Sequence, residues 1–182
     1  KYGYGEFVEY IPPQQVGQWT ASAHYHAAVY DRLSGHIHPL KYALGLAKAC
    51  IAAGVKIFEH SHVKSLQLGD RPRIETATGN VACRFAVLAT NIFIGNLAPK
   101  LDERIMPVGG TVFATEQLDP QLADSLIRDR AAVCDSNFLL DYYRVTPDHR
   151  VLWGGRSTYS KHDSSDGVEW LRQKMVGLYP QL

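Results

Sequence analysis

The clearest candidate for a chemical role in this sequence is the run Tyr142-Tyr143-Arg144. Side chains alternate between the two faces of a strand, so Tyr142 and Arg144 share one face and Tyr143 lies on the other. A guanidinium can bind a carboxylate through two parallel hydrogen bonds, and a nearby phenol can add another. The run therefore indicates a substrate carboxylate site. The alternative is a surface arginine beside two packing tyrosines.

A second arginine follows two glycines in the sequence Gly154-Gly155-Arg156. Glycine carries no side chain, so a flat ring can approach the backbone closely at such a place. Arg156 is therefore a second candidate for substrate binding. The alternative interpretation is an ordinary turn.

The histidines form two closely spaced pairs, His24-x-His26 and His36-x-His38. Two imidazoles two residues apart lie on one face of a strand, which is a geometry that can bind a metal. No Asp, Glu or Cys accompanies either pair at ligand spacing, so we predict no metal site. His38 is better explained as the residue that precedes a helix.

Composition sets the class of protein. The 182 residues suffice for one medium domain or two small ones, and 19 basic residues nearly balance 18 acidic ones. This balance favours neither nucleic acid nor an anionic membrane as a partner, and no apolar run reaches the roughly 18 residues of a membrane helix. Cys50, Cys83 and Cys134 lack the spacing of a zinc site. We expect buried, reduced thiols in a cytoplasmic protein without a signal peptide.

The strongest element that could position these residues is a helix predicted over 39–53. Pro39 suits the first helical position, and apolar residues recur at helical spacing along the segment. Gly54 can end the helix in a left-handed conformation. Its many small residues would let the helix lie close against a sheet.

Alternating and apolar runs predict strands on both sides of this helix. One strand is predicted at 24–30, and two buried strands are predicted at 55–58 and 85–89. Antiparallel strands are predicted at 63–68 and 73–77, and a third follows the turn Thr78-Gly79-Asn80. Longer strands are predicted at 105–115 and 137–145, and the chain then turns into a strand at 150–153. A short helix begins at Asp119-Pro120, and a capping box Asp166-x-x-Glu169 begins a last helix. The order predicts an α+β chain.

In their order and spacing, several of these motifs resemble the D-amino-acid-oxidase-like FAD-dependent oxidoreductases. The motifs are Ser34–Pro39, the helix to Gly54, Val55–Glu59 with His62-Val63, Leu88–Asn91, Arg104–Gly109, Asp141–Arg144 and Trp153–Arg156. Within that family, the GHIHP turn and the Asp-Tyr-Tyr-Arg strand are most similar to the gamma-glutamylputrescine oxidases.

The resemblance implies a partial FAD-binding α/β layer beside a mainly antiparallel substrate-binding sheet. Residues 35–92 would belong to the FAD-binding domain. Residues 1–34 would form a segment of the substrate domain, and residues 93–182 the substrate-binding domain itself. This layering is expected where a substrate domain is interleaved with a nucleotide-binding one.

The same resemblance implies FAD as the cofactor and suggests four contacts to it. Val63 would contact the adenine through its backbone, and Ala89, Thr90 and Asn91 would lie at a strand end near the ribose or phosphate. The family usually has Gly where Asn91 stands, but Asn tolerates the left-handed conformation better than most residues. A core valine and an ordinary strand exit are the alternatives.

The activity implied by the resemblance is oxidation of a C–N bond in an amine or amino acid by hydride transfer to the flavin. The substrate would be like gamma-glutamylputrescine, or like sarcosine or glycine. Tyr142, Arg144 and Arg156 would bind it. Position alone nominates His36 as a catalytic residue that assists proton removal.

No Gly-x-Gly-x-x-Gly occurs in the sequence to hold a pyrophosphate. We therefore expect the central fragment of a longer enzyme, which would be colourless and inactive alone. Exposed apolar faces would then allow self-association. The alternatives are a non-catalytic module that binds a ligand or partner, and a metalloprotein built on the histidine pairs.

Overall fold

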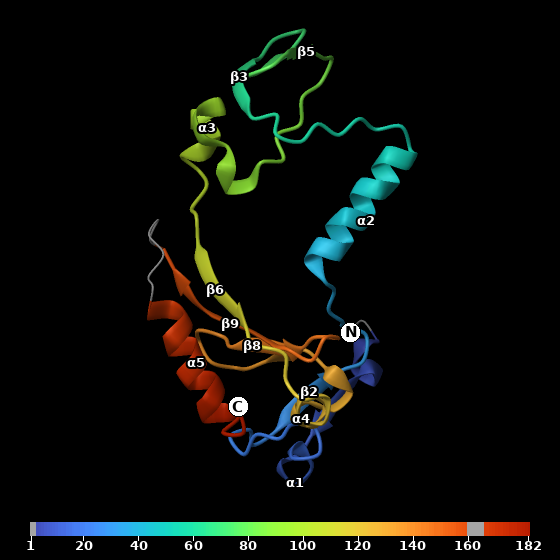
Figure 1. Cartoon of the computed structure of the whole chain (residues 1–182), viewed down its shortest axis with the longest axis vertical. Helices are drawn as coiled ribbons and strands as arrows, with labels where there is room; N and C mark the ends of the chain where they lie inside the picture. The colour runs from blue at the N-terminus through green and yellow to red at the C-terminus, as the bar shows by residue number, and fades with distance from the viewer. Residues whose placement is uncertain (1–2, 160–165) are drawn as a thin grey trace. The chain divides into compact units, whose positions relative to one another are not determined.

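The structure is a computed structural model that describes residues 3–159 and 166–182. The chain divides into two compact units, which are coloured along the sequence in Figure 1. The first unit is formed by residues 1–36 and 108–182, and the second by residues 37–107. Both contain helices and sheets, and every strand pair among the described residues is antiparallel. The mixed α+β class is therefore as predicted.

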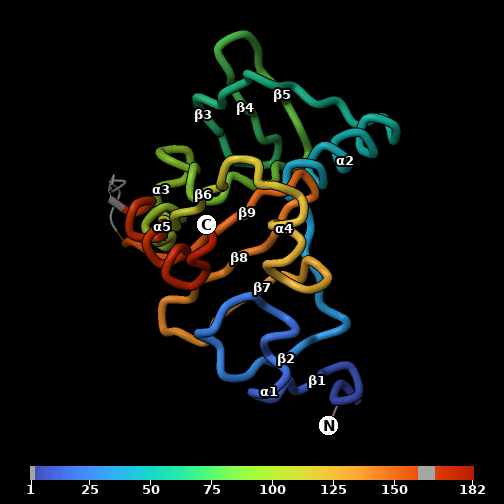
Figure 2. The backbone as a smooth tube through the Cα atoms, turned by 60° about the horizontal axis from the view of Figure 1, so that its bottom comes forward, coloured from blue at the N-terminus to red at the C-terminus, as the bar shows by residue number. Residues whose placement is uncertain are grey.

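The first unit is built on a four-stranded sheet in the order β6-β9-β8-β7, which can be followed in Figure 2. Its strands are β6 Gly109–Ala114, β7 Val133–Cys134, β8 Tyr142–Val145 and β9 Val151–Thr158. A separate hairpin-like pair consists of β1 Val8–Ile11 and β2 Ala28–Asp31. The helices are η1 Tyr4–Phe7, α1 Pro13–Val16, α4 Pro120–Leu126, η4 Arg128–Arg130 and α5 Asp166–Leu178.

The core of this unit lies between α5 and one face of the sheet. Tyr143 and Trp153 stack there with ring centroids 4.0 Å apart and planes 3° from parallel, and Tyr179 meets both rings edge-on. Leu171 and Met175 bring the apolar side of α5 onto these rings. Because alternate strand residues point to opposite faces, the neighbours of Tyr143 on β8 must face away from the core.

The second unit carries the predicted helix as α2 Pro39–Ala52. His38 precedes it and accepts the Lys41 backbone N–H at Nδ1 at 3.3 Å, and Gly54 follows it with a φ of 85°. A three-stranded sheet consists of β3 Val63–Gln67, β4 Arg73–Thr76 and β5 Asn80–Ala82. The remaining elements are η2 Asn91–Phe93, η3 Gly95–Leu97 and α3 Pro99–Asp102.

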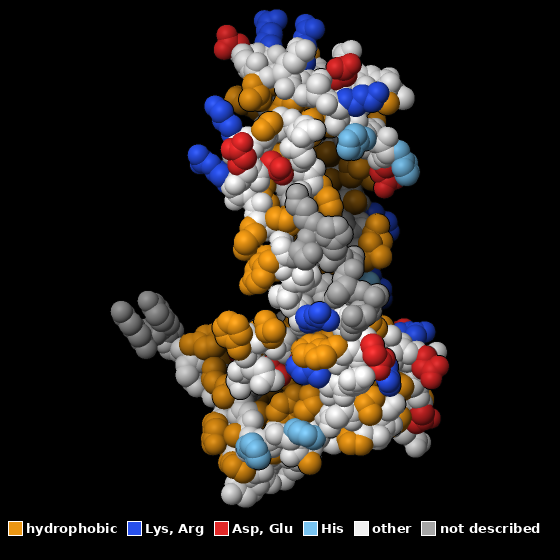
Figure 3. Space-filling model, turned by 90° about the vertical axis from the view of Figure 1, so that its left-hand side faces the viewer, with side chains coloured by type: hydrophobic (Ala, Val, Ile, Leu, Met, Phe, Trp, Pro, Cys, Tyr) orange, Lys and Arg blue, Asp and Glu red, His pale blue; other side chains and the backbone are white. Residues whose placement is uncertain are grey.

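The two buried strands predicted for this unit are wrong. Residues 55–58 and 85–89 form no strand, and Phe58, Phe85 and Val87 are 74, 85 and 88% exposed. Apolar runs of this kind are typical of strands that are covered on both faces, and no described strand pairs with either run here. Helix α2 likewise buries no residue. Figure 3 shows apolar side chains lying open on the surface.

Other expectations need smaller corrections. The strand predicted at 24–30 begins only at Ala28, so His24 and His26 precede it. The strand predicted at 137–145 begins at Tyr142, because the Asp135 carboxylate accepts the backbone N–H groups of Asn137 and Asp141 and holds a loop.

Strand β9 continues to Thr158, beyond the predicted 150–153, and β6 is shorter than the predicted 105–115. The last helix begins at Asp166, the residue with which the predicted capping box starts. The cysteines are free thiols as expected, but the expectation of burial is wrong. Cys50 and Cys134 are exposed, and Cys83 is half-buried.

Candidate substrate site

Tyr142 and Arg144 lie on the open face of the four-stranded sheet, as the alternation predicts. Tyr143 is 3% exposed on the core side, whereas Tyr142 is 44% exposed. In the register of β8 and β9, Tyr142 is opposite Gly154 and Arg144 is opposite Leu152. Residues opposite each other share a face, so this part of the sheet presents a phenol and a guanidinium together.

The Tyr142 ring lies across the backbone of Gly154. A Cβ built at Gly154 would be 2.1 Å from Tyr142 Cε2 and 2.7 Å from its hydroxyl oxygen. The hydroxyl is directed toward β6, where it lies 4.0 Å from a Cβ built at Gly110. The ring can lie here because Gly154 has no side chain, whereas a Cβ at Gly110 would make only an ordinary contact with the hydroxyl.

Tyr142 and Arg156 line the same small cavity, whose volume is about 220 Å³. Its other lining residues are Gly110, Phe138, Leu139, Leu140, Gly155 and Ser157. Arg156 has a φ of 49° at an irregularity in the β6–β9 register. Such a bulge redirects a side chain, and Arg156 here lines the cavity. Its Nη1 lies 3.7 Å from a Cβ built at Gly167 of α5. Two of the three predicted substrate-binding residues, Tyr142 and Arg156, thus line one cavity.

Arg144 lies on the same sheet face but does not line this cavity, and its partner is His36. Arg144 Nη1 donates a hydrogen bond to His36 Nδ1, and His36 Nε2 lies 3.2 Å from the Arg130 carbonyl oxygen. His36 is thus joined to a predicted substrate residue 108 positions away in the sequence. Its assignment as a catalytic residue stays a prediction.

The four residues predicted to contact FAD all belong to the second unit. Val63 begins β3, an edge strand, and such a strand leaves backbone N–H and C=O groups open on one side. Ala89 lies in the irregular segment before η2. Asn91 has a φ of 51°, the left-handed conformation for which Asn suits a glycine position.

The side-chain hydroxyl of Thr90 bears on whether this region can hold a polar cofactor. Its Oγ1 is buried and has no hydrogen-bond partner among the described residues. A buried hydroxyl without a partner is costly, so a ligand group that bonds to it would be stabilising. The open strand edge, the left-handed turn and this hydroxyl fit part of a nucleotide. The four contacts themselves stay predictions.

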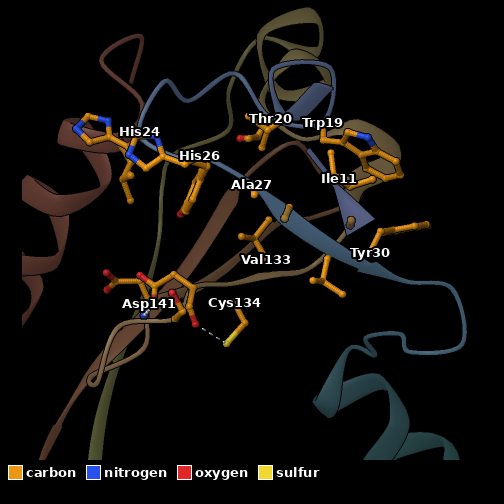
Figure 4. A pocket seen from close by; sticks show the side chains of 18 of the residues that line it. Ile11, Trp19, Thr20, His24, His26, Ala27, Tyr30, Val133, Cys134 and Asp141 are labelled. Atoms are coloured by element: carbon orange, nitrogen blue, oxygen red, sulfur yellow. Dashed lines mark hydrogen bonds between the residues drawn. The ribbon is translucent and has the colours of Figure 1, made fainter. Parts of the chain in front are cut away.

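A larger cavity of about 900 Å³ lies in the first unit, where β2 and β7 border it. Figure 4 shows His24 and His26 at one end and Trp19 and Tyr30 at the other. Asp141 also lines it; this carboxylate is 1% exposed and forms an ion pair with Lys174 of α5. No group of three or more metal-ligating side chains occurs within residues 3–159 and 166–182.

Four hydroxyls form a chain between that cavity and the core. Tyr25 and Tyr143 hydroxyls are 2.7 Å apart, Tyr179 donates to Tyr143 at 3.2 Å, and Thr20 and Tyr179 are 2.6 Å apart. Burial raises the pKa of Tyr25 to about 12 and also raises the pKa of Tyr143 and Tyr179. These phenols therefore stay neutral near pH 7 and act as hydrogen-bonding groups. The spacing of these residues in the sequence has no period, so no local pattern predicts that their hydroxyls meet.

Residues 1–182 match the family model DAO, described as FAD dependent oxidoreductase. The chain therefore belongs to this family of FAD-dependent oxidoreductases, as the motif order predicted. No helix among the described residues is long and apolar enough to span a membrane.

Three curated relatives are similar over most of this chain. A probable oxidoreductase OrdL of Haemophilus influenzae is 40% identical over 171 residues, which are 91% of this chain and 38% of the relative. The gamma-glutamylputrescine oxidoreductase of Escherichia coli is 37% identical over 96% of this chain and 41% of its own length. A probable OrdL of Rhizobium meliloti is 31% identical over the whole chain and 42% of its own length. The chain thus spans about two-fifths of these relatives.

Proposed function

We propose that this chain forms the substrate-binding part, and a portion of the FAD-binding part, of an oxidoreductase that oxidises a C–N bond in an amine or amino acid. The family is FAD dependent, and FAD when bound accepts a hydride from the substrate carbon. The residues of this chain would bind the substrate, orient that carbon and exclude water. Residues 35–92 would belong to the FAD-binding domain, and Val63, Ala89, Thr90 and Asn91 would hold part of the cofactor.

The observation that carries this proposal is a pair of half-buried arginines that have no counter-charge among the described residues. Arg144 and Arg156 form no ion pair with any carboxylate in the described part of the chain, although both are half-buried. Arginines that do form ion pairs are Arg32, Arg128, Arg130, Arg150 and Arg172. A partly desolvated cation is stabilised by an anion, so these two positions suit a carboxylate ligand.

The substrate class follows from that chemistry. We propose an α-carboxylate held by a guanidinium and by the Tyr142 hydroxyl, as in gamma-glutamylputrescine or in sarcosine and glycine. A relative 37% identical to this chain is named a gamma-glutamylputrescine oxidoreductase. We place His36 beside the substrate site, next to Arg144. We also place the enzyme in the cytoplasm without a nucleic-acid partner.

Calorimetric titration of the chain with gamma-glutamylputrescine tests this proposal. The matched ligand 4-aminobutanoylputrescine lacks only the α-carboxylate. We expect Arg144→Gln and Arg156→Gln each to weaken binding of gamma-glutamylputrescine about tenfold, which corresponds to roughly 1.4 kcal/mol. Arg73→Gln changes an exposed arginine of the second unit and should have no effect. Equal affinity for the two ligands would contradict the proposal.

A further inference from the structure

We infer that His36 is a positioning residue that holds the Arg144 guanidinium in the orientation needed to bind a carboxylate. The inference rests on the proposed function, because it assigns Arg144 a ligand. In this inference the His36 imidazole affects binding only by orienting the Arg144 side chain. The argument uses only contacts within the first unit.

The two hydrogen bonds of His36 determine its tautomer. The Arg130 carbonyl oxygen, 3.2 Å from Nε2, can only accept a hydrogen bond, so Nε2 carries the ring proton. Nδ1 is then unprotonated and accepts from Arg144 Nη1. A neutral imidazole in this one tautomer satisfies both contacts. Its only lone pair faces Arg144 and is not free to take a substrate proton.

The bond to His36 leaves the opposite edge of the guanidinium open. With Nη1 engaged, the Nε and Nη2 donors of Arg144 still form a two-donor fork. The same edge binds carboxylates elsewhere in this chain. Arg172 Nε and Nη2 donate to the two oxygens of Glu169, each at 2.8 Å. The Nε and Nη2 donors of Arg144 can therefore bind a carboxylate in the way that those of Arg172 bind Glu169.

The backbone that anchors His36 is itself fixed. Asp129 and Arg130 have φ values of 56° and 49°, which set the direction of the Arg130 carbonyl. The Arg130 side chain donates to Asp124 from Nε at 2.9 Å and from Nη2 at 2.6 Å, and contacts His149 Nε2 at 3.1 Å. His36 thus connects Arg144 to a loop held at several points.

A double-mutant cycle tests the inference in the same calorimetric titration. His36→Phe keeps a flat ring but removes both nitrogens, so Arg144 must be ordered by the ligand alone. Ordering such a side chain on binding has an entropic cost, so we expect affinity for gamma-glutamylputrescine to fall about fivefold. Affinity for 4-aminobutanoylputrescine should not change. His36→Gln, whose amide oxygen can still accept a hydrogen bond, should recover part of the loss.

The combined variant separates the two proposals. If His36 acts only through Arg144, His36→Phe will have no further effect once Arg144→Gln is present. Additive effects would overturn the positioning role and leave the carboxylate site intact. No effect of Arg144→Gln alone would overturn the proposed function, and with it the inference.

Nitrogen NMR of the ligand-free chain supplies a readout that does not depend on binding. We expect the His36 ring to show the Nε2–H tautomer, and Arg144→Gln to shift the Nδ1 resonance. A protonated Nδ1, or a resonance unmoved by Arg144→Gln, would overturn the inference. Far-UV circular dichroism confirms that each variant is folded.

Discussion

Tyr142 keeps its position at the scale of single residues because Gly154 has no side chain. Gly154→Ala would place a Cβ 2.1 Å from the Tyr142 ring, far inside contact distance. The ring or the strand must then move, so we expect a loss of about 1–3 kcal/mol in the free energy of unfolding. Weaker binding of gamma-glutamylputrescine should accompany it. Urea denaturation and calorimetric titration measure the two effects.

Gly177→Ala is the matched control in the same unit. A Cβ at Gly177 meets nothing within 4 Å, and the residue lies in helix α5. Alanine favours a helix over glycine by up to about 1 kcal/mol, so this variant should be as stable as the parent or more so. Equal behaviour of the two variants would show that Tyr142 does not depend on the absence of a side chain at Gly154.

The backbone conformation of Asn91 could be predicted from its residue type, but the burial of its neighbour could not. The family's usual glycine indicated a left-handed backbone, and the φ of 51° agrees. The buried, unbonded hydroxyl of its neighbour Thr90 had no such signal. Burial of one oxygen depends on side chains from elsewhere in the unit, whereas the tolerance of Asn for a positive φ is a property of the residue type.

At the scale of elements, helix α5 is joined to the sheet by a buried ion pair as well as by apolar contacts. Lys174 forms an ion pair with Asp141, which is 1% exposed and immediately precedes β8. Lys174→Met would leave that carboxylate buried without its counter-charge. We expect a loss of about 3–5 kcal/mol in the free energy of unfolding, measured by urea denaturation.

Two further variants show whether this loss comes from the unpaired charge. Asp141→Asn combined with Lys174→Met removes both charges and should be more stable than Lys174→Met alone. Arg172→Gln removes an exposed ion pair of the same helix, and surface pairs contribute little. If Lys174→Met costs no more than Arg172→Gln, the buried pair does not hold the helix.

In the second unit, some elements are specified by residues close in sequence, whereas others depend on neighbours that are distant in sequence. Helix α2 and the β3–β4–β5 sheet form where predicted because a proline, a terminal glycine and tight turns specify them within a few residues. Residues 55–58 and 85–89 carry apolar runs of equal clarity but remain irregular. Their conformation depends on sheet neighbours that the local sequence does not provide.

At the scale of the whole molecule, the exposed apolar runs predict self-association. Phe58, Phe85 and Val87 are all more than 70% exposed, and two of them belong to one run. Contiguous exposed apolar surface favours contact between copies. We expect the sedimentation coefficient of the chain to rise with concentration. The combined substitutions Phe85→Ser and Val87→Ser should lower that dependence.

Leu68→Ser is the control for this experiment. Leu68 is 79% exposed but lies outside these runs, and single exposed apolar residues are common on protein surfaces. Its substitution should leave the sedimentation unchanged. A coefficient independent of concentration for the parent chain would show that these runs do not mediate association.

Signals within short stretches of sequence determined the α+β class, helix α2, the antiparallel strands, the face shared by Tyr142 and Arg144, and the family. Only the tertiary structure decided that Tyr142 rests on Gly154, that Arg156 enters its cavity and that Arg144 meets His36. Alternation and capping act between near neighbours, so a local pattern reveals them. Contacts between distant residues depend on strand register and on a bulge, which are set by the packing of the whole unit.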